Sequence, residues 1–314
     1  MTQTTTNTKN QRHIWIAVLL SLIMPGLGQI YCGKLARGLV FTFLNILPLP
    51  ITIGLLAMSS SSLLMPMVDA LILLAGLVQL IAIIDSVCLA HRAKEYVLKD
   101  YNRPIVYVLL LVLITTGCAG SAFYLREQLL EAFWAPVASN YPTILPGDRF
   151  IANKIAYKSG DPKRGDLIVF LNPRDRRINY IKRVVAVAGQ TAEIKNGELY
   201  IDDQKLPRQK LPESVLDNIR IKVQGKPLDG DVFLETNGDT KYKIFLAKPP
   251  HDKMASDFAK ITVPKHHCFV LGDNRNTSFD SRHFGPVLLA TVIGRADYLY
   301  WPAKDFSRFG KFDR

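Results

Sequence analysis

The stretch "YIKRVVAVAGQTAEIKNGELYID", residues 180–202, carries the pattern that decides the fold of the C-terminal half. Two runs rich in Val, Ile and Tyr flank the pair Asn196-Gly197, which favours a two-residue type I′ hairpin. A second Asn-Gly pair at 237–238 indicates another hairpin, and no long amphipathic helix interrupts this half. Further strand-like runs occupy 149–157, 166–172, 267–273 and 292–301. We therefore expect a mainly antiparallel β domain over residues 131–314.

The N-terminal part is too apolar for an ordinary soluble enzyme. Over its 314 residues the chain is 48% hydrophobic, with a mean hydropathy of +0.12. Four apolar stretches occupy 14–32, 37–58, 63–90 and 104–124. A membrane span needs about 20 mostly apolar residues, and the last two stretches meet this requirement clearly. We expect an α-helical membrane region over 14–92 with about three apolar segments, and a final transmembrane helix over 104–130.

Basic residues in the short loop at 93–103 predict that this loop is cytoplasmic. The final helix then runs outward, and residues 131–314 are extracytoplasmic. Basic residues also lie on both sides of the first apolar stretch: Lys9, Arg12, Lys34 and Arg37. Both groups are cytoplasmic only if that stretch is re-entrant, which its Pro25, Gly26 and Gly28 allow. We favour this alternative, with residues 1–13 inside, over four full spans with the N-terminus outside.

Two quoted stretches of the membrane region resemble the TM2-type small membrane domain. They are "PGLGQIYCGKLARG", residues 25–38, and "IAIIDSVCLA", residues 81–90. This resemblance implies no known chemistry. Asp69 and Asp85 each lie near one end of an apolar stretch, where a carboxylate reaches headgroups or the basic loop, so neither is assigned a catalytic role.

The net charge of +12 does not point to nucleic acid, because the sequence lacks zinc-ligand spacing, a basic helix and an RNA-binding aromatic signature. A basic protein with membrane segments is expected to meet anionic lipid headgroups instead. The four cysteines, none of which has a close partner in the sequence, are Cys32, Cys88, Cys118 and Cys268. We expect no disulfide, no redox or metal site and no cofactor.

A Ser-His-Asp hydrolase has little support, because Ser139 lies in no G-x-S-x-G motif and the histidines lack an evident acid partner. A lysine can replace the histidine. Strand alternation places Tyr180, Lys182 and Val184 on one face. A lysine accepts a proton only if its pKa falls from about 10.4 toward neutrality, which burial achieves by disfavouring the charged form. Neutral Lys182 would then take the proton of Ser139.

Five ordered blocks of the sequence resemble the bacterial type I signal peptidases. The blocks are "SNYPTILPGDRFIANKIAY" (139–157), "RGDLIVFLNP" (164–173), "YIKRVVAVAGQ" (180–190), "FVLGDNRNTSFDSRHFGPV" (269–287) and "VIGRADYLYWP" (292–302). The resemblance implies a membrane serine endopeptidase of the bacterial cytoplasmic membrane that removes signal peptides from exported preproteins. It implies that the substrate lies along a β-edge, with small residues at the first and third positions before the cut.

The resemblance also assigns roles to individual residues. Ser139 is the implied nucleophile, Lys182 the general base and Ser278 the hydroxyl that orients the lysine. The implied structural ion pairs around the site are Asp273 with Arg183 and Asp280 with Arg282. Pro142 and Pro146 are expected to shape the loop that presents Ser139. Phe133 and Trp134 fit an interfacial aromatic belt.

Two positions depart from the family pattern. Asn140 replaces the usual methionine after the nucleophile, and Val137 stands where an oxyanion-assisting hydroxyl is often found. Oxyanion stabilisation is then expected to depend mainly on the backbone N–H of Ser139. These departures leave open a specialised peptidase that matures pilins or conjugation proteins. A further alternative, from another functional class, is a catalytically weak membrane scaffold.

Overall fold

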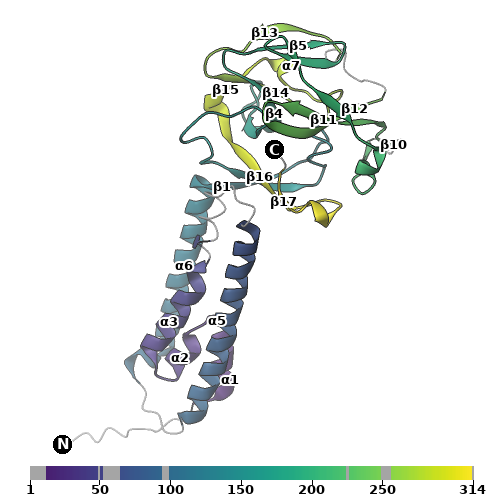
Figure 1. Cartoon of the computed structure of the whole chain (residues 1–314). Coiled ribbons are helices and arrows are strands. Elements are labelled where there is room, and N and C mark those ends of the chain that lie inside the picture. Colours follow the sequence, from purple (N-terminus) through teal and green to yellow (C-terminus); the bar gives the residue numbers. More distant parts are fainter. Residues whose placement is uncertain are drawn as a thin grey trace, which may run out of the picture. The chain divides into compact units, whose positions relative to one another are not determined.

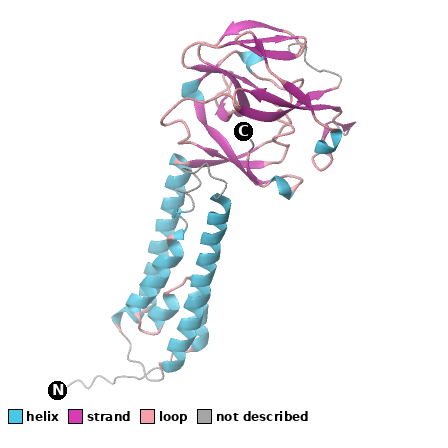
Figure 2. Ribbon diagram, in the orientation of Figure 1, coloured by secondary structure: helices cyan, strands magenta, loops and turns pink. Residues whose placement is uncertain are grey.

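The structure, a computed structural model, describes residues 12–48, 50–51, 64–93, 99–223, 226–248 and 256–312. Most of the predicted N-terminal segment, the end of the second apolar stretch, much of the basic loop and His251 lie outside these residues. The chain divides near residue 125 into two compact units, a helical unit followed by a β-rich unit (Figures 1 and 2). Each unit is described by itself.

Two long apolar helices dominate the helical unit. They are α5 (Leu64–Arg92) and α6 (Pro104–Gln128). Within them, Asp69–Arg92 and Pro104–Tyr124 are long and apolar enough to cross a membrane. The third and fourth predicted segments are therefore helices, although α6 ends at Gln128 rather than at residue 130.

The first apolar stretch forms a short helical hairpin. Helix α1 (Ile14–Ile23) is separated from α2 (Leu27–Tyr31) by a turn in which Gly26 has a φ of 106°. A Cβ at Gly28 would lie 2.4 Å from the carbonyl oxygen of Ala17, so only glycine allows the two arms to pack this closely. The backbone N–H of His13 donates to the Tyr31 hydroxyl at 3.2 Å. The hairpin therefore returns to the place where it begins.

The next elements meet at that same end of the helical unit. Helix α3 (Leu35–Ile46) leaves it, and the 3-10 turn η1 (Asp100–Asn102) contacts it again. The Tyr101 hydroxyl donates to the Gly33 carbonyl at 2.6 Å, and the Asn102 side chain donates to the Ile30 carbonyl at 2.9 Å. Three segments are thus neighbours at this end: the residues just before α1, those just after α2 and those of η1, which follows α5.

The two acids of the apolar stretches, Asp69 and Asp85, differ in their surroundings. Asp85 forms an ion pair with Arg37 at 3.0 Å and accepts a hydrogen bond from the buried Gln29 at 3.3 Å. Its partner is therefore a side chain of α3 within the helical unit. Asp69 is exposed on α5.

The β-rich unit is built around one large sheet with the strand order β1-β2-β16-β3-β4-β14-β15, with β17 added on β16. Every named pairing in it is antiparallel. Its strands are β1 (Leu130–Trp134), β2 (Arg149–Asn153), β3 (Leu167–Leu171), β4 (Asn179–Val187), β14 (His267–Leu271), β15 (Val287–Leu288), β16 (Val292–Trp301) and β17 (Gly310–Lys311).

Three smaller antiparallel sheets complete the unit. The first contains β5 (Thr191–Lys195), β6 (Glu198–Ile201), β7 (Gln204–Lys205) and β13 (Phe258–Thr262). The second contains β8 (Arg208–Lys210), β11 (Gly230–Asn237) and β12 (Thr240–Ala247), and the third pairs β9 (Lys222–Val223) with β10 (Lys226–Pro227). The short helices are α7 (Ser281–Phe284), η2 (Glu213–Leu216), η4 (Leu289–Thr291) and η5 (Phe306–Arg308). The prediction of a mainly antiparallel β domain is confirmed.

Both predicted hairpins are present. Asn196 and Gly197 have φ angles of 51° and 77° between β5 and β6, as a type I′ turn requires. Gly238, with a φ of 63°, lies in the turn between β11 and β12. The local signal of an Asn-Gly pair was therefore sufficient to place both turns.

One local prediction needs correction. The predicted strand at 149–157 stops at Asn153, because the Asn153 side chain accepts the backbone N–H of Ile155 at 3.1 Å and turns the chain.

The two aromatic residues expected at an interfacial belt lie side by side at the end of β1. Phe133 is partly buried, packs on the sheet core and stacks on Phe150 at 5.7 Å, whereas its neighbour Trp134 is 63% exposed. Their place at a membrane interface stays a prediction.

Candidate active site

Ser139 lies in the segment that joins β1 to β2, and backbone hydrogen bonds hold this segment in place. The Tyr141 N–H donates to the Ala138 carbonyl at 3.1 Å, which closes a turn around the serine. The backbone N–H of Asn274 donates to the Ser139 carbonyl at 3.1 Å, and its side chain donates to the Ala138 carbonyl at the same distance. The loop after β14 therefore fixes the main chain of Ser139.

The loop also contains both prolines that were expected to shape it. The Tyr141–Pro142 peptide bond is cis. Pro146 precedes Gly147, whose N–H donates to the Ala135 carbonyl at 2.7 Å and closes the segment on itself.

Lys182 extends from β4 toward this serine. Its side chain is only 4% exposed, and Nζ donates to Ser139 Oγ at 2.8 Å. Tyr180 and Val184 belong to one apolar cluster on the same face of the strand, in the alternation that the sequence predicts. The structure therefore brings the two residues, which are 43 positions apart, into direct contact.

The surroundings of Lys182 favour the neutral amine. Burial is the largest influence and lowers the pKa of Lys182 to about 8, although the Asp280 and Asp273 carboxylates oppose this change. Neither carboxylate is free to neutralise the amine, because each is held by an arginine in an ion pair. A buried lysine with such a pKa has a substantial neutral fraction in mildly alkaline solution.

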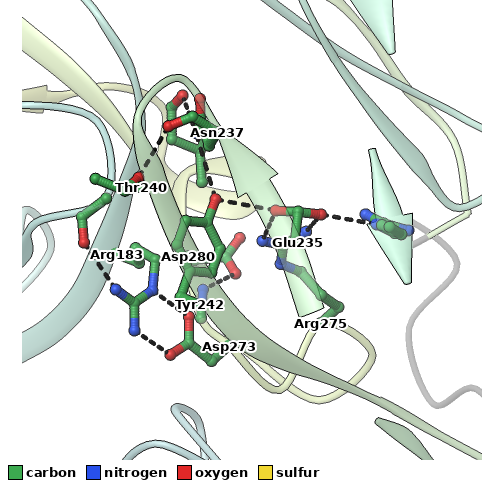
Figure 3. A network of polar contacts seen from close by, with 12 residues as sticks. Arg183, Glu235, Asn237, Thr240, Tyr242, Asp273, Arg275 and Asp280 are labelled. Atoms are coloured by element: carbon green, nitrogen blue, oxygen red, sulfur yellow. Dashed lines mark hydrogen bonds and ion pairs between the residues drawn. The ribbon is translucent and has the colours of Figure 1, made fainter. Parts of the chain in front are cut away.

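The first of these ion pairs joins the strand of the lysine to the loop after β14. Arg183 donates two hydrogen bonds to the Asp273 carboxylate, each at 2.7 Å, and both side chains are almost fully buried (Figure 3). The Thr143 hydroxyl donates to the same carboxylate at 2.6 Å. Asp273 thus connects β4, the loop of Ser139 and its own loop.

The second ion pair lies within the loop and the short helix α7. Arg282 contacts both carboxylate oxygens of Asp280 at 2.8 Å. The Asp280 carboxylate also caps α7 and accepts the backbone N–H of Gly272 at 3.0 Å. Both ion pairs implied by the sequence are therefore present as contacts.

Ser278 is close to the nucleophile but does not make the contact expected of it. Its side chain is 2% exposed, and Oγ has no hydrogen-bond partner among the described residues, Lys182 included. A Cβ at Gly272 would lie 2.1 Å from Ser278 Oγ and 2.4 Å from the Ser139 carbonyl oxygen. Ser278 therefore packs against the main chain of Ser139 across a position that only glycine can occupy.

The two departures from the family pattern have different surroundings. Asn140 is 2% exposed, and its side-chain amide donates to the carbonyl of Ile181 at 2.7 Å. This bond ties the residue after the nucleophile to the residue before Lys182. Val137 is 61% exposed and supplies no hydroxyl to the site.

A buried polar network behind the site was not predicted from the sequence. Glu235 on β11 is fully buried and accepts hydrogen bonds from Arg275 at 2.6 and 2.9 Å, from Arg208 at 2.7 Å and from the Tyr242 hydroxyl at 3.0 Å (Figure 3). Burial opposes ionisation, but the Arg275 and Arg208 guanidiniums outweigh it and lower the pKa of Glu235 to about 2. Residues 40 apart in the chain form this pair, so no local sequence signal could have indicated it.

Arg275 connects this network to the loop after β14, called the catalytic loop below because it carries Gly272 and Ser278. Its backbone N–H donates to the Phe245 carbonyl on β12 at 3.0 Å, and its carbonyl accepts a hydrogen bond from Arg282 at 2.7 Å. The hairpin β11–β12 is therefore connected to the segment that carries Gly272 and Ser278.

The described residues contain no group of three His, Cys, Asp or Glu side chains that could hold a metal ion. The four cysteines are free thiols. At the site itself, a serine hydroxyl lies beside a buried amine, with two buried ion pairs around them.

The sequence is similar to those of known peptidases. The model of the family "Signal peptidase, peptidase S26" matches residues 105–301. Signal peptidase I of Bacillus caldolyticus is 34% identical over 170 residues, which are 54% of this chain and 78% of that protein. Signal peptidase I of Aquifex aeolicus is 29% identical over 232 residues, which are 65% of this chain and 85% of that protein.

A solved structure is also similar in sequence. The crystal structure of a signal peptidase I from Enterococcus faecalis is 29% identical, and the alignment covers 43% of this chain and 95% of that chain with a TM-score of 0.25. The family model itself spans more than half of the 314 residues and includes Ser139, Lys182 and Ser278. The chain therefore belongs to the S26 family of signal peptidases, serine endopeptidases that remove signal peptides from preproteins.

Proposed function

We propose that this chain cleaves signal peptides with Ser139 as the nucleophile and Lys182 as the general base. The observation that carries this proposal is the contact of 2.8 Å between Ser139 Oγ and Nζ of a lysine that is 4% exposed. The lowered pKa of Lys182, about 8, gives the amine the lone pair that a base needs.

The reaction follows from these two atoms. As Ser139 Oγ attacks the scissile carbonyl carbon, neutral Nζ takes the hydroxyl proton and becomes an ammonium. The ammonium then donates that proton to the nitrogen of the leaving peptide, the C–N bond breaks, and an ester to Ser139 remains. Water attacks the ester with Lys182 again accepting the proton, and the serine is regenerated.

The remaining groups hold this pair. The backbone N–H of Ser139 is the proposed donor to the oxyanion, since Val137 supplies no hydroxyl. We assign Ser278 to the support of the pair, because a buried hydroxyl without a partner is unfavourable unless it has a role. Asp273 with Arg183 and Asp280 with Arg282 keep their carboxylates away from the amine.

The chain is membrane-associated, and we propose that it is multi-pass with the basic end of the helical unit in the cytoplasm. Helix α1 has 10 residues and rises about 15 Å, half of a hydrocarbon core of about 30 Å. The hairpin returns to its start, so Arg12, Lys34 and Arg37 can lie on one side together with Lys99 and Arg103. This arrangement favours the re-entrant alternative, with residues 131–314 extracytoplasmic in the bacterial cytoplasmic membrane and the basic side facing anionic lipids.

The proposal is tested with the full chain in neutral detergent and a model preprotein. We expect cleavage by the wild type at one bond, identified by mass spectrometry of the product, and none by Ser139→Ala. Ser159→Ala, which changes an exposed serine outside the site, is the matched control and should cleave normally. Retention of cleavage in Ser139→Ala would exclude Ser139 as the nucleophile, and an inactive wild type that still binds preproteins would favour the scaffold alternative.

A further inference from the structure

A cavity of about 270 Å³ lies on the side of the β unit that Arg183 faces. Arg183 and Thr143 contribute to its lining, together with Lys241 and Lys243 of β12, Arg308 of η5 and Lys311 of β17. Arg183 follows Lys182 directly in β4 and therefore points to the opposite face of that strand. The cavity is thus separate from the Ser139–Lys182 pair.

The lining of this cavity is strongly cationic. Five lysine and arginine side chains line it, and the only carboxylate among the lining residues belongs to Asp305. That carboxylate accepts the backbone N–H of Ser307 as a helix cap. Arg183 and Arg308 have carboxylate partners of their own, Asp273 and Asp148.

Two of the lysines lack such a partner. Lys241 and Lys243 form no ion pair within the described part of the chain, and both are exposed on β12. Two other lysines of the same sheet region behave differently, since Lys210 and Lys248 both bind Asp231, at 2.8 and 2.6 Å. Lys241 and Lys243, which line the cavity, therefore have no carboxylate partner among the described residues.

We propose that this cavity binds a phosphate group. The amines of Lys241 and Lys243 supply charge, and Ser214 and Asn218, which also line the cavity, supply neutral polar groups. A phosphate has several acceptor oxygens, which suits a ring of such donors, and lysine binds it as a point charge. The volume of about 270 Å³ accommodates a phosphate with a small substituent, such as a glycerol unit.

The position of the cavity connects the ligand to the peptidase. Thr143 and Arg183 line the cavity and also hold the Asp273 carboxylate, at 2.6 and 2.7 Å. Asp273 follows Gly272, which separates Ser139 from Ser278. A bound phosphate therefore contacts the residues that support the catalytic loop from behind.

Two sources share this chemistry, the headgroup of an anionic phospholipid and free phosphate. Amine acylation followed by mass spectrometry distinguishes them on the full chain, because a bound anion keeps a lysine protonated and slows its reaction. One arm compares inorganic phosphate with chloride at equal ionic strength in neutral detergent. The other compares nanodiscs of phosphatidylcholine with nanodiscs that also contain phosphatidylglycerol. Lys158 and Lys265, exposed lysines that do not line the cavity, are internal controls.

We expect Lys241 and Lys243 to react roughly tenfold more slowly with the ligand present, as for one charge-assisted contact each, while the controls stay unchanged. Protection by phosphate alone assigns the site to a soluble anion, and protection by phosphatidylglycerol alone assigns it to lipid. In Lys241→Gln the protection of Lys243 should fall, whereas in Lys265→Gln it should persist. The proposal would be overturned if, in both arms, the ligand changed the acylation rates of Lys241 and Lys243 no more than those of the controls. The readout does not require peptidase activity, so it is independent of the role of Ser139.

Discussion

The two faces of β4 carry adjacent buried cations and place them in opposite environments. Lys182 is 4% exposed and Arg183 is 1% exposed, so burial alone does not distinguish them. Arg183 is held by Asp273 at 2.7 Å, and although burial opposes it, this carboxylate raises the pKa of Arg183. Lys182 instead contacts the neutral hydroxyl of Ser139. The Asp273 carboxylate compensates the buried charge of Arg183, whereas burial without a carboxylate in direct contact lowers the pKa of Lys182 and allows it to give up its proton.

The largest effect is expected when the lysine on one face of β4 is replaced by an arginine, the residue type found on the other face. Lys182→Arg retains a positive charge but cannot be deprotonated, so it removes the base. We expect kcat/KM for a model preprotein to fall by about 10²- to 10⁴-fold, the usual contribution of a general base. Thermal unfolding of the purified variant serves as the control for folding. A variant with more than a tenth of wild-type activity would contradict the assignment of Lys182.

The contribution of the Arg183–Asp273 ion pair to stability is tested by removing the carboxylate. Asp273→Asn leaves the Arg183 guanidinium buried without a counter-charge, which typically costs about 3–5 kcal/mol of folding free energy. We expect a correspondingly lower unfolding midpoint in denaturant. The matched control is Asp203→Asn, which breaks the exposed pair with Lys260 and should leave the unfolding midpoint almost unchanged. Equal effects of the two substitutions would mean that the buried pair contributes no special support.

The pH dependence of cleavage reports the protonation state of Lys182. The pKa of Lys182 is about 8, and only the neutral amine accepts the serine proton, so activity should rise with pH and level off above this value. Below it, kcat/KM should fall about tenfold per pH unit, as for a single titrating base. Initial rates measured at constant ionic strength would reveal this limb. A profile that is flat between pH 6 and 9 would be inconsistent with Lys182 as the base.

The smallest of these effects concerns the link between the nucleophile and the lysine strand. Asn140→Leu removes the donor of a part-buried hydrogen bond to the Ile181 carbonyl, and a typical hydrogen bond contributes about 0.5–1.5 kcal/mol to stability. If the bond positions Ser139 against Lys182, kcat should fall roughly tenfold with little change in KM. Asn45→Leu, which removes a bond to the Ala75 carbonyl in the helical unit, should leave kcat unchanged. A change in KM alone would show that Asn140 acts on substrate binding instead.

Local signals were sufficient for much of the fold. Asn196-Gly197 and the Asn-Gly pair at 237–238 placed two hairpins because the turn chemistry depends only on neighbouring residues. The end of β2 was missed, because it depends on a side chain, that of Asn153, which turns the chain before the apolar run ends. The broken first helix could be predicted from its proline and glycines, but the contact of His13 with Tyr31 could not.

The site was predicted less evenly. The family resemblance identified Ser139 and Lys182, and their distance required the register of β4 against the loop of the serine. Ser278 was expected to orient the lysine, and its hydroxyl instead lies beside the main chain of Ser139. Glu235 had no signal at all, since a buried acid is recognised only by partners that are distant in sequence.

The buried Glu235 also makes the loop with Gly272 and Ser278 depend on a separate hairpin, β11–β12. Arg275 is fixed only when Glu235 is packed beneath it and β12 offers the Phe245 carbonyl. A substitution that removes the Glu235 carboxylate would leave the Arg275 and Arg208 guanidiniums buried without their counter-charge. A change on β11, far from Ser139 in the sequence, would therefore act on the loop with Gly272 and Ser278 through the contacts of Arg275.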